Sequence, residues 1–562
     1  MPAKPDLTQV ERDKLTINPD FDFKNDIAAR PFEDLTTNDI GMFKWSGIYH
    51  QLQKGFFMMR LRIPGGLINA DQMEVVARIA EKYGQDQVCI TTRMTFQFHW
   101  LRKEDLYKVM EELATVGLDS KNACGDVTRN IVTCPLQGVC PHEVKDVRAM
   151  IEAIAEDPEI RDEQRNLPRK HKMSINGCGR ACGQTLMNCL SWHPVKRTRA
   201  DGTEEIGWKY YAGGGLGARP YMAKSIFDWV PEELVLPVTR AATEAFRRLG
   251  NRRVRAYSRL KIVVDELGAR GFAEEVLKVM RERGDTGLET LEHAKGPPEI
   301  GELFTDGQDV IPQRQPGTNT VRVMIMRSEM TARQVRQVAQ WARTYGDGSI
   351  MLTARQNLQI RFVPDARVPA LLGELKAAGY TVDGHERLPD MVACVGTTQC
   401  NLAVSDTPAT YRRLYEELAS DRAFWEQVGQ LRIHMNGCPN SCAQHWIADL
   451  GLRGMRKERE NGSEEGFTIC VGGGLTGPGY IGQALCDVPS TEVVPTVRRL
   501  LEHYVKDRTG PDERFGVYAR RVGAVKLAQQ LGLTPGTAEP ASERNQRLSK
   551  TFDEVISETS PW

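Results

Sequence analysis

The chain repeats itself once over most of its 562 residues, and this repeat limits the folds that it can adopt. The first copy begins at residue 56 and reads FFMMRLRIPGGLINADQMEVVARIAEKYGQDQVCITTRMTFQFHW. The second begins at residue 318 and reads TNTVRVMIMRSEMTARQVRQVAQWARTYGDGSIMLTARQNLQIRF. One shift of 262 residues aligns Arg60 with Arg322, Tyr83 with Tyr345, Gly84 with Gly346, Arg93 with Arg355 and Gln97 with Gln359. The repeat predicts two duplicated halves that share one fold.

Each copy has the pattern of a strand, a helix and a second strand. Residues 58–63 alternate in polarity, and residues 88–100 are rich in β-branched and aromatic side chains. Residues 70–84 place apolar side chains on one helical face and end in a glycine. Further helices are expected at 103–117 and 366–379. The pattern predicts a sheet with helices on one side.

The later part of each half repeats a set of four cysteines. The sets are Cys134, Cys140, Cys178 and Cys182 in the first half, and Cys394, Cys400, Cys438 and Cys442 in the second. In both sets five residues separate the first pair, three separate the last pair, and the second cysteine precedes the third by 38 positions. A triple glycine follows in each half, in YAGGGLG at 211–217 and VGGGLTG at 471–477.

The composition excludes several classes of protein. Lys and Arg total 74, as do Asp and Glu, so net charge gives no reason to expect nucleic acid or a membrane surface as a partner. No run approaches the roughly 20 apolar residues of a membrane span, and the first residues lack the apolar core of a signal peptide. We therefore expect a cytoplasmic protein. Its 13 cysteines, an odd number, favour metal binding or reactive thiols over disulfides.

The spacing of the cysteines favours an iron–sulfur cluster over zinc. Structural zinc sites use cysteine pairs two to four residues apart, and the wider first pair fits them poorly. Four thiolates from two loops suit a [4Fe–4S] cluster, in which each iron takes one cysteine. The remaining cysteines are interpreted as ordinary buried thiols: Cys89, Cys124, Cys189, Cys470 and Cys486.

Several motifs together resemble one known family. They are ACVGTTQCNLA and MNGCPNSCAQH, with RLRIPGG, TTRMTFQFHW, TRNIVTCP, LPRKHK and GGGL, and they span about residues 40–530. The combination resembles the sirohaem- and [4Fe–4S]-containing sulfite and nitrite reductases of the assimilatory type. This resemblance implies an α+β fold, internally duplicated with pseudo-two-fold symmetry, with ferredoxin-like half-domains and two α/β domains of the sirohaem-binding type.

The repeat and the resemblance together predict seven segments. They are an N-terminal arm at 1–44, a first ferredoxin-like half-domain at 45–120, a first α/β domain with the substrate cations at 121–292, a linker at 293–317, a second ferredoxin-like half-domain at 318–385, a second α/β domain with the cluster and sirohaem at 386–537, and a C-terminal tail at 538–562.

The resemblance also implies which residues form the site. The cluster ligands would be Cys394, Cys400, Cys438 and Cys442, and Cys442 would also bind the sirohaem iron. A shared thiolate couples two iron centres and pushes electron density towards the bound substrate. The cations for an oxyanion substrate would be Arg60, Arg129, Lys170 and Lys172; on a strand the two lysines would face the same side. The sirohaem would contact Arg93, Gln97 and Asn440, and further Arg and Lys must bind its carboxylates.

The cysteines of the first half leave two interpretations open. Cys134, Cys140, Cys178 and Cys182 keep the full ligand spacing, so they could hold a second cluster. The cations facing them are fewer: Arg322, Arg355 and Arg432 match Arg60, Arg93 and Lys172, but Gln430 and Pro389 match Lys170 and Arg129. We therefore expect no second catalytic sirohaem and interpret the four thiols as a relic of the duplication.

Three functions fit these residues. A lysine at both positions of LPRKHK favours sulfite over nitrite, because sulfite carries more charge. The main prediction is six-electron reduction of sulfite to sulfide; nitrite reduction to ammonia and a non-catalytic iron–sulfur electron carrier are the alternatives. The glycine runs do not match a dinucleotide fingerprint. Electrons are therefore expected from a separate protein, either a ferredoxin or a flavoprotein reductase.

Overall fold

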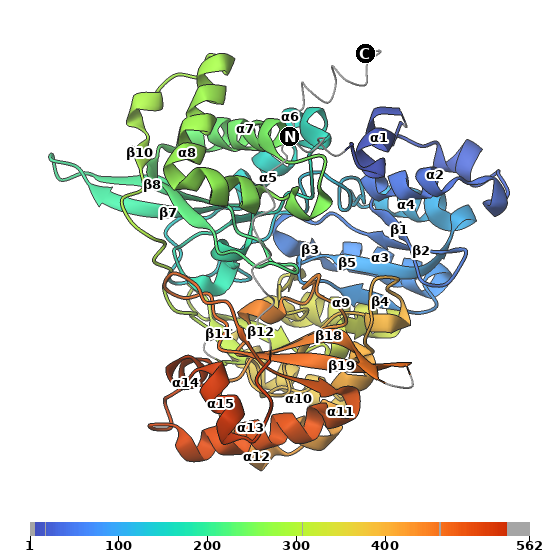
Figure 1. Ribbon diagram of the computed structural model, residues 1–562, viewed down its shortest axis with the longest axis vertical. Coiled ribbons are helices and arrows are strands. Elements are labelled where there is room, and N and C mark those ends of the chain that lie inside the picture. Colours follow the sequence, from blue (N-terminus) through green and yellow to red (C-terminus); the bar gives the residue numbers. More distant parts are fainter. Residues whose placement is uncertain (1–5, 17, 306, 460–461, 537–562) are drawn as a thin grey trace.

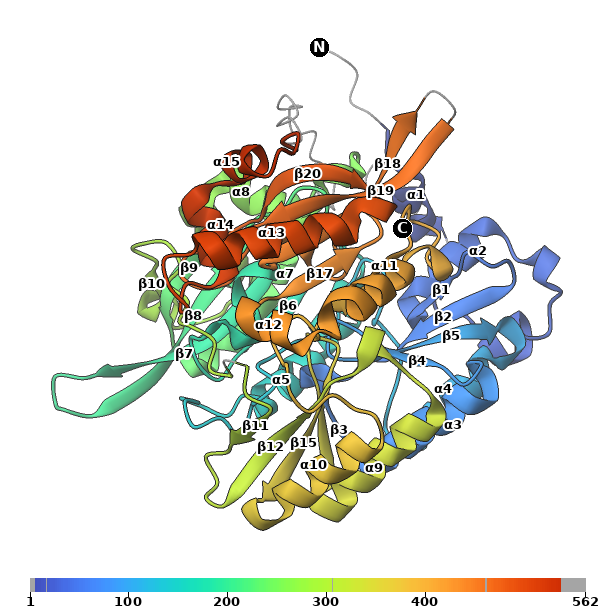
Figure 2. The same cartoon turned by 90° about the horizontal axis from the view of Figure 1, so that it is seen from below.

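A computed structural model describes residues 6–16, 18–305, 307–459 and 462–536 (Figures 1 and 2). The expected C-terminal tail at 538–562 lies outside the described residues, as do the first five residues of the expected arm. The described chain forms four five-stranded sheets, two in each half. The duplication predicted from the sequence is therefore present in the architecture.

Two of the sheets exchange a strand. The first contains β1 (Ile48–His50), β2 (Phe56–Arg60), β5 (Phe96–Arg102), β4 (Val88–Ile90) and β13 (Glu329–Met330), in that order. The other contains β11 (Val310–Pro312), β12 (Thr318–Val323), β15 (Leu358–Pro364), β14 (Ser349–Leu352) and β3 (Leu67–Asn69). Strand β13 belongs to the second half and β3 to the first, so each half completes the other's sheet.

Two helices pack against each other across the pseudo-two-fold axis. These are α3 (Ala70–Tyr83) and α9 (Ala332–Tyr345), and each begins with a capping box, Asn69 with Gln72 and Thr331 with Gln334. The next helices of the two half-domains are α4 (Leu106–Ala114) and α10 (Val368–Ala377), and Figure 2 shows all four along one side of the molecule. Buried side chains of both half-domains form one continuous hydrophobic core.

The α/β domain of the first half has a sheet of strands in the order β10–β9–β8–β7–β6. Their bounds are β6 Met173–Ile175, β7 Leu190–Thr198, β8 Glu204–Ala212, β9 Lys224–Val230 and β10 Glu292–His293. Its helices are α5 Arg148–Ala155, α6 Pro158–Arg161, α7 Glu232–Leu249 and α8 Leu260–Arg283. Strands β6 and β7 are parallel and the others are antiparallel.

The α/β domain of the second half has the order β16–β17–β18–β19–β20. Its strands are β16 Val392–Ala393, β17 Ile433–Asn436, β18 Leu450–Arg459, β19 Gly462–Val471 and β20 Gln483–Pro489. Its helices are α11 Thr407–Leu414, α12 Arg422–Val428, α13 Val493–Asp507, α14 Phe515–Val522 and α15 Ala524–Gln530. Here β16 and β17 are parallel, as are β17 and β18, whereas β19 is antiparallel to both β18 and β20, as β8 is to β7 and β9 in the first half.

The segments outside the repeated units also join the two halves or dock on one of them. Ile300 pairs with Gly477 and Gly301 with Arg180, so the expected linker contacts both α/β domains. Helix α1 (Gln9–Thr16) of the expected arm is anchored by a Glu11–Arg252 ion pair of 2.6 Å. Helix α2 (Thr37–Met42) follows it, and none of the described helices has the length and apolar character needed to cross a membrane.

Replacement of Ile68 by alanine should destabilise both halves. Ile68 is 2% exposed on β3 and pairs with Ile350 of the other half. We expect the free energy of unfolding in urea to fall by about 2–4 kcal/mol, because a buried aliphatic side chain is lost from a shared core. Leu52→Ala is the control, because Leu52 is 54% exposed. Equal midpoints for the two variants would contradict the shared core.

Candidate active site

The sheet of the second α/β domain brings the cysteines at 394, 400, 438 and 442 together. Cys394 follows β16 directly, and Cys438 lies two residues after β17. Because β16 and β17 are parallel neighbours, their carboxyl ends meet at one edge of the sheet. Cys400 and Cys442 extend from the same two loops. The topology thus explains how two distant sequence pairs form one set.

The four thiols are close enough to influence one another. Burial raises the pKa of Cys438 to about 12, and the neighbouring Cys442, Cys394 and Cys400 contribute in the same direction. Backbone N–H groups point at the sulfur atoms: Gly437 donates to Cys394 Sγ at 3.2 Å, and Asn440 and Leu402 donate to Cys438 and Cys400. Such hydrogen bonds are typical of cluster ligands.

The described residues contain no group of three or more His, Cys, Asp or Glu side chains arranged to hold a single metal ion. A zinc site would gather its four sulfur atoms about 2.3 Å from one ion. A cubane cluster separates its ligands more widely, since each thiolate binds a different iron.

Cys442 differs from the other cysteines in its exposure. It is exposed, whereas Cys438 is buried and Cys394 and Cys400 are half-buried. The hydroxyl of Thr92, from the first half, donates to the carbonyl of Cys442 at 2.7 Å. Cys442 also lies within electrostatic reach of Arg60 of the first half. Cys442 thus lies at the boundary between the cluster loops and the first half.

Five residues that the sequence assigned to substrate or cofactor form a cationic cluster beside Cys442. Their mutual electrostatic effects show that they lie together: Arg60, Arg93, Arg129, Lys170 and Lys172. No ion pair to a carboxylate is found for any of them within the described part of the chain. Buried cations without counter-ions are costly, so this arrangement indicates a binding site for anionic groups.

Lys170 and Lys172 flank His171 in an extended segment that bridges to Thr128. His171 is fully buried, and the two half-buried lysines point the other way, as predicted for alternate residues. Burial, together with the nearby Arg259 and Arg169, lowers the pKa of Lys170 to about 7. Burial, Arg93 and Lys170 hold the pKa of Lys172 well below its ordinary value.

The arginines are held by neutral partners. Arg60 donates to Gln97 Oε1 at 2.8 and 3.1 Å, so Gln97 positions Arg60. Arg129 donates to the carbonyl oxygens of Gly125 and Ala123. These contacts fix the guanidinium groups and leave their charge uncompensated.

Arg93 is also held by neutral groups, but its fixation is incomplete. It donates to Asn188 Oδ1 at 2.6 Å, while its buried Nε has no partner. Burial lowers the pKa of Arg93 to about 9. Asn440, predicted to bind cofactor, has an exposed side chain, and its backbone N–H is the group directed at Cys438.

Sequence reasoning missed two cations of this region, Arg259 and Lys261. Both lie at the start of α8. Arg259 lowers the pKa of Lys170, and Lys170 in turn lowers the pKa of Lys261. Burial and Arg259 lower the pKa of Lys261 to about 7. The available signal was the basic stretch NRRVRAYSRLK at 251–261. Cys189, interpreted as an ordinary buried thiol, is fully buried but accepts a 3.4 Å contact from Arg259.

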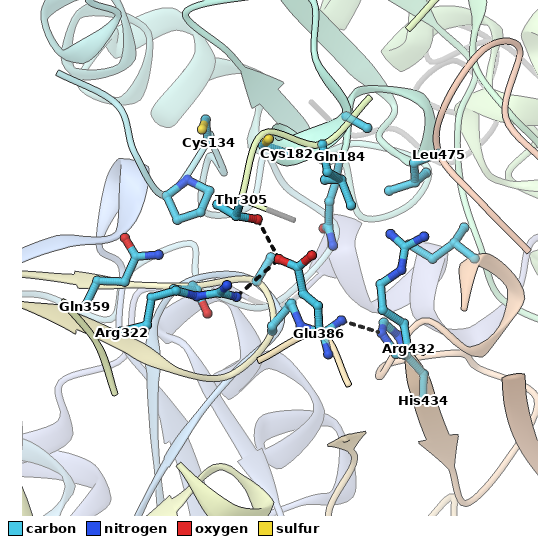
Figure 3. Close-up of a pocket in the computed structure, with 17 residues that line it drawn as sticks. Cys134, Cys182, Gln184, Thr305, Arg322, Gln359, Glu386, Arg432, His434 and Leu475 are labelled. Atoms are coloured by element: carbon cyan, nitrogen blue, oxygen red, sulfur yellow. Dashed lines mark hydrogen bonds and ion pairs between the residues drawn. The ribbon is translucent and has the colours of Figure 1, made fainter. Parts of the chain in front are cut away.

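A cavity, here called the second cavity, lies at the pseudo-two-fold counterpart of the cationic cluster (Figure 3). Its volume is about 70 Å³, and its lining includes Cys134, Cys182, Arg322, Arg355, Arg432 and Glu386. In Figure 3, Glu386 points towards Arg322 and Thr305 in its centre. The cations of the second half thus face the cysteines of the first half, as the alignment of the two halves predicted.

Every cation of the second cavity has a carboxylate partner. Arg322 pairs with Glu386 at 3.2 Å, Arg355 with Asp390 at 2.8 Å and Arg432 with Asp449 at 3.3 Å. The matching positions of the first half, 260 residues earlier, are Asp126, Asn130 and Cys189. Asp126 instead pairs with Lys14 and Arg255. The two regions therefore differ sharply in available positive charge.

Comparison with known proteins identifies the family. The model of the nitrite and sulphite reductase 4Fe-4S domain matches residues 124–283 and 386–536. The model of the nitrite/sulfite reductase ferredoxin-like half domain matches residues 49–116 and 311–378. The chain belongs to the nitrite and sulfite reductase family. The fold inferred from the resemblance is therefore confirmed.

Individual relatives carry both activities in their names. An assimilatory ferredoxin-dependent nitrite reductase of Haloferax mediterranei is 31% identical, with 83% of each chain covered. A sulfite reductase [ferredoxin] 1 of Mycolicibacterium paratuberculosis is 30% identical, with 90% of this chain and 92% of that one covered. The solved structure of the Mycobacterium tuberculosis NirA protein has a TM-score of 0.82 and 28% identity, and covers 93% of this chain and 97% of that one.

The residues of this reductase fit the cofactors of the family, a [4Fe–4S] cluster and sirohaem. Four thiols, of which Cys394, Cys400 and Cys438 accept backbone N–H hydrogen bonds, would supply the cluster ligands. The uncompensated cations, with the unpartnered buried Nε of Arg93 among them, suit the many carboxylates of sirohaem. The second cavity fits sirohaem poorly, because its cations are already paired with carboxylates.

Lys170 should control how the reductase responds to pH. Since its pKa is lowered to about 7, the ammonium is present below pH 7 and is lost as the pH rises through 7. We expect kcat/KM for nitrite, whose charge is constant in this range, to fall above pH 7. Lys170→Arg should abolish that fall and lower the maximal kcat/KM, because arginine keeps its charge but does not give up a proton. A pH profile identical in the two proteins would contradict this assignment.

Proposed function

We propose that this reductase converts sulfite to sulfide in a six-electron reduction. The observation that carries the proposal is that Lys170 and Lys172 both lie within electrostatic reach of Cys442, while no ion pair between either lysine and a carboxylate is found in the described part of the chain. A doubly charged oxyanion gains more from two adjacent ammonium groups than a singly charged one does. The proposed cluster ligands are Cys394, Cys400, Cys438 and Cys442.

Arg60, Arg129, Lys170 and Lys172 would bind the oxyanion. The arginines hold oxygen atoms in a fixed fork, and Gln97 keeps Arg60 in place. The backbone carbonyls on Arg129 leave its position set before substrate arrives. Preorganised positive charge of this kind stabilises negative charge without reorganisation during the reaction.

Proton delivery would fall to the lysines. Each oxygen of the substrate leaves as water, so a donor that titrates near neutral pH is required. Lys170, with a pKa of about 7, meets this requirement, whereas the arginines remain protonated. Lys261 also has a pKa of about 7 and lies within electrostatic reach of Lys170, but its ammonium donates to the backbone carbonyls of Leu216 and Arg219.

Sirohaem, when bound, would supply the iron that holds the sulfur atom, and the adjoining cluster would supply electrons. Cys442 is the proposed shared ligand, because it is the exposed cysteine of its set and its thiolate acts on Arg60, Lys170 and Lys172. Arg93 would bind sirohaem carboxylates together with Arg259 and Lys261, and Asn440 would act through its backbone N–H. Ferredoxin is the proposed electron donor, since both relatives are named as ferredoxin-dependent enzymes.

Steady-state kinetics tests the choice of substrate. Methyl viologen reduced electrochemically, so that no sulfite enters from dithionite, donates electrons to sulfite or to nitrite. Lys172→Asn should lower kcat/KM for sulfite by about tenfold, or about 1.4 kcal/mol, and affect nitrite less. Lys196→Asn, on the exposed part of β7, is the control.

Nitrite reduction is the second candidate, because relatives named nitrite reductase match as well as those named sulfite reductase. A wild-type kcat/KM for nitrite far above that for sulfite would replace the proposal with this candidate. Absence of sirohaem absorption in the purified protein would favour a non-catalytic electron carrier over both.

Cys442→Ser should separate the two cofactors. We expect the electronic coupling between sirohaem and cluster to disappear from electron paramagnetic resonance spectra, since serine cannot provide the bridging thiolate. Cys486→Ser on β20 is the matched control and should keep the coupling. Retention of the coupling in the Cys442 variant would show that another residue forms the bridge.

A further inference from the structure

The cysteines at 134, 140, 178 and 182, here called the first-half thiols, are brought together by the same topology as the cluster ligands. Cys134 lies two residues after Val132, which bridges to Ser174 of β6 in parallel. Cys178 lies three residues after the end of β6. The carboxyl ends of parallel neighbours meet at one sheet edge, so two loops again carry two cysteines each.

The first-half thiols influence one another as a complete set. Cys140, Cys178 and Cys182 all lie within electrostatic reach of Cys134, and Cys134 and Cys182 share a side-chain hydrogen bond. Each sulfur therefore lies within electrostatic reach of the others. A relic under no constraint to bind a metal would have no reason to keep all four thiols converging.

Backbone N–H groups are directed at these sulfur atoms in the same pattern as in the second half. In each case the donor lies two residues after the cysteine. Leu136 donates to Cys134 at 3.4 Å, and His142 and Arg180 donate to Cys140 and Cys178. The corresponding donors of the second half are Gly396, Leu402 and Asn440. Such donors are typical of cluster-bound thiolates.

The fourth thiol has a donor from another segment. Phe304, in the expected linker, donates its backbone N–H to Cys182 at 3.4 Å. Leu136, Val139 and Ile311 pack around the set and exclude solvent.

We propose that the first-half thiols bind a second [4Fe–4S] cluster, one that has no sirohaem beside it. The neighbouring cavity cannot serve sirohaem in the way that the cationic cluster does, because Glu386, Asp390 and Asp449 pair with its cations. The site would therefore hold a one-electron carrier without a substrate site. This proposal does not depend on whether the anion reduced is sulfite or nitrite.

A direct connection joins the two cysteine sets. Gln184 and Gln444 exchange two hydrogen bonds between their side-chain amides, at 2.8 and 3.1 Å. Gln184 lies two residues after Cys182, and Gln444 two residues after Cys442. Both glutamines are at least nine-tenths buried. The second cluster would thus sit across the pseudo-two-fold axis from the first, linked to it through a short, buried contact.

Iron content tests the proposal in the whole protein. Anaerobically purified holoprotein should contain about nine irons per chain, eight in two clusters and one in sirohaem. The double variant Cys140→Ser with Cys178→Ser should contain about five. It should keep the sirohaem absorption and turnover with methyl viologen. Cys470→Ser removes a buried cysteine of neither set and should keep the wild-type iron content.

Spin counting gives an independent measurement. Fully reduced wild-type protein should show about one more [4Fe–4S] spin per chain than the double variant. About five irons in wild-type protein, or a disulfide between Cys134 and Cys182 found by mass spectrometry of that protein, would overturn the proposal. The wild-type count decides the matter even if the variant fails to fold. Absence of turnover would count against the proposed function alone, because iron is counted separately.

Discussion

The exchange of strands β3 and β13 is the constraint on which the rest of the molecule depends. It joins the half-domains through a single core and fixes the two halves about a pseudo-two-fold axis. As a result, each of the two site regions is built from both halves. Cations of the first half face Cys442 of the second, and cations of the second half face Cys134 and Cys182 of the first. Neither region could form within one half.

Charge pairing then makes the two regions different. Buried arginines without carboxylate partners attract anionic groups. Arginines that are paired with carboxylates are already neutralised inside the protein. In the second half, Glu386 and Asp390 pair with the arginines. Their counterparts in the first half, Asp126 and Asn130, form no ion pair with the cationic cluster in the described part of the chain. The two cysteine sets keep the same spacing, so the difference in available positive charge arises from the cations and carboxylates. Under the proposal of a second cluster, loss of anion binding and loss of metal binding are separate events in a duplicated protein.

The parts of this structure that follow a period or a fixed spacing could be predicted from the sequence. Helices α3 and α9 have clear apolar faces, and the cysteine spacings located both thiol sets. Strands β3 and β13 could not be predicted from the sequence, because they contain only three and two residues and are too short to show a periodic pattern. Arg259 and Lys261 were missed because they reach Lys170 only through the fold. Glu386 and Asp390, the partners of Arg322 and Arg355, could not be predicted either, because ion pairs between residues distant in the sequence leave no local pattern.

The strand exchange also has a consequence for biosynthesis. Strand β4 ends at Ile90, but its neighbour β13 starts only at Glu329. During translation at about 5–20 residues per second, the edge of the first sheet would stay unpaired for a time on the order of tens of seconds. Open sheet edges pair readily with other chains. The nascent chain is therefore most exposed to aggregation before its second half emerges, and a chaperone that shields β4 during this interval would favour correct folding.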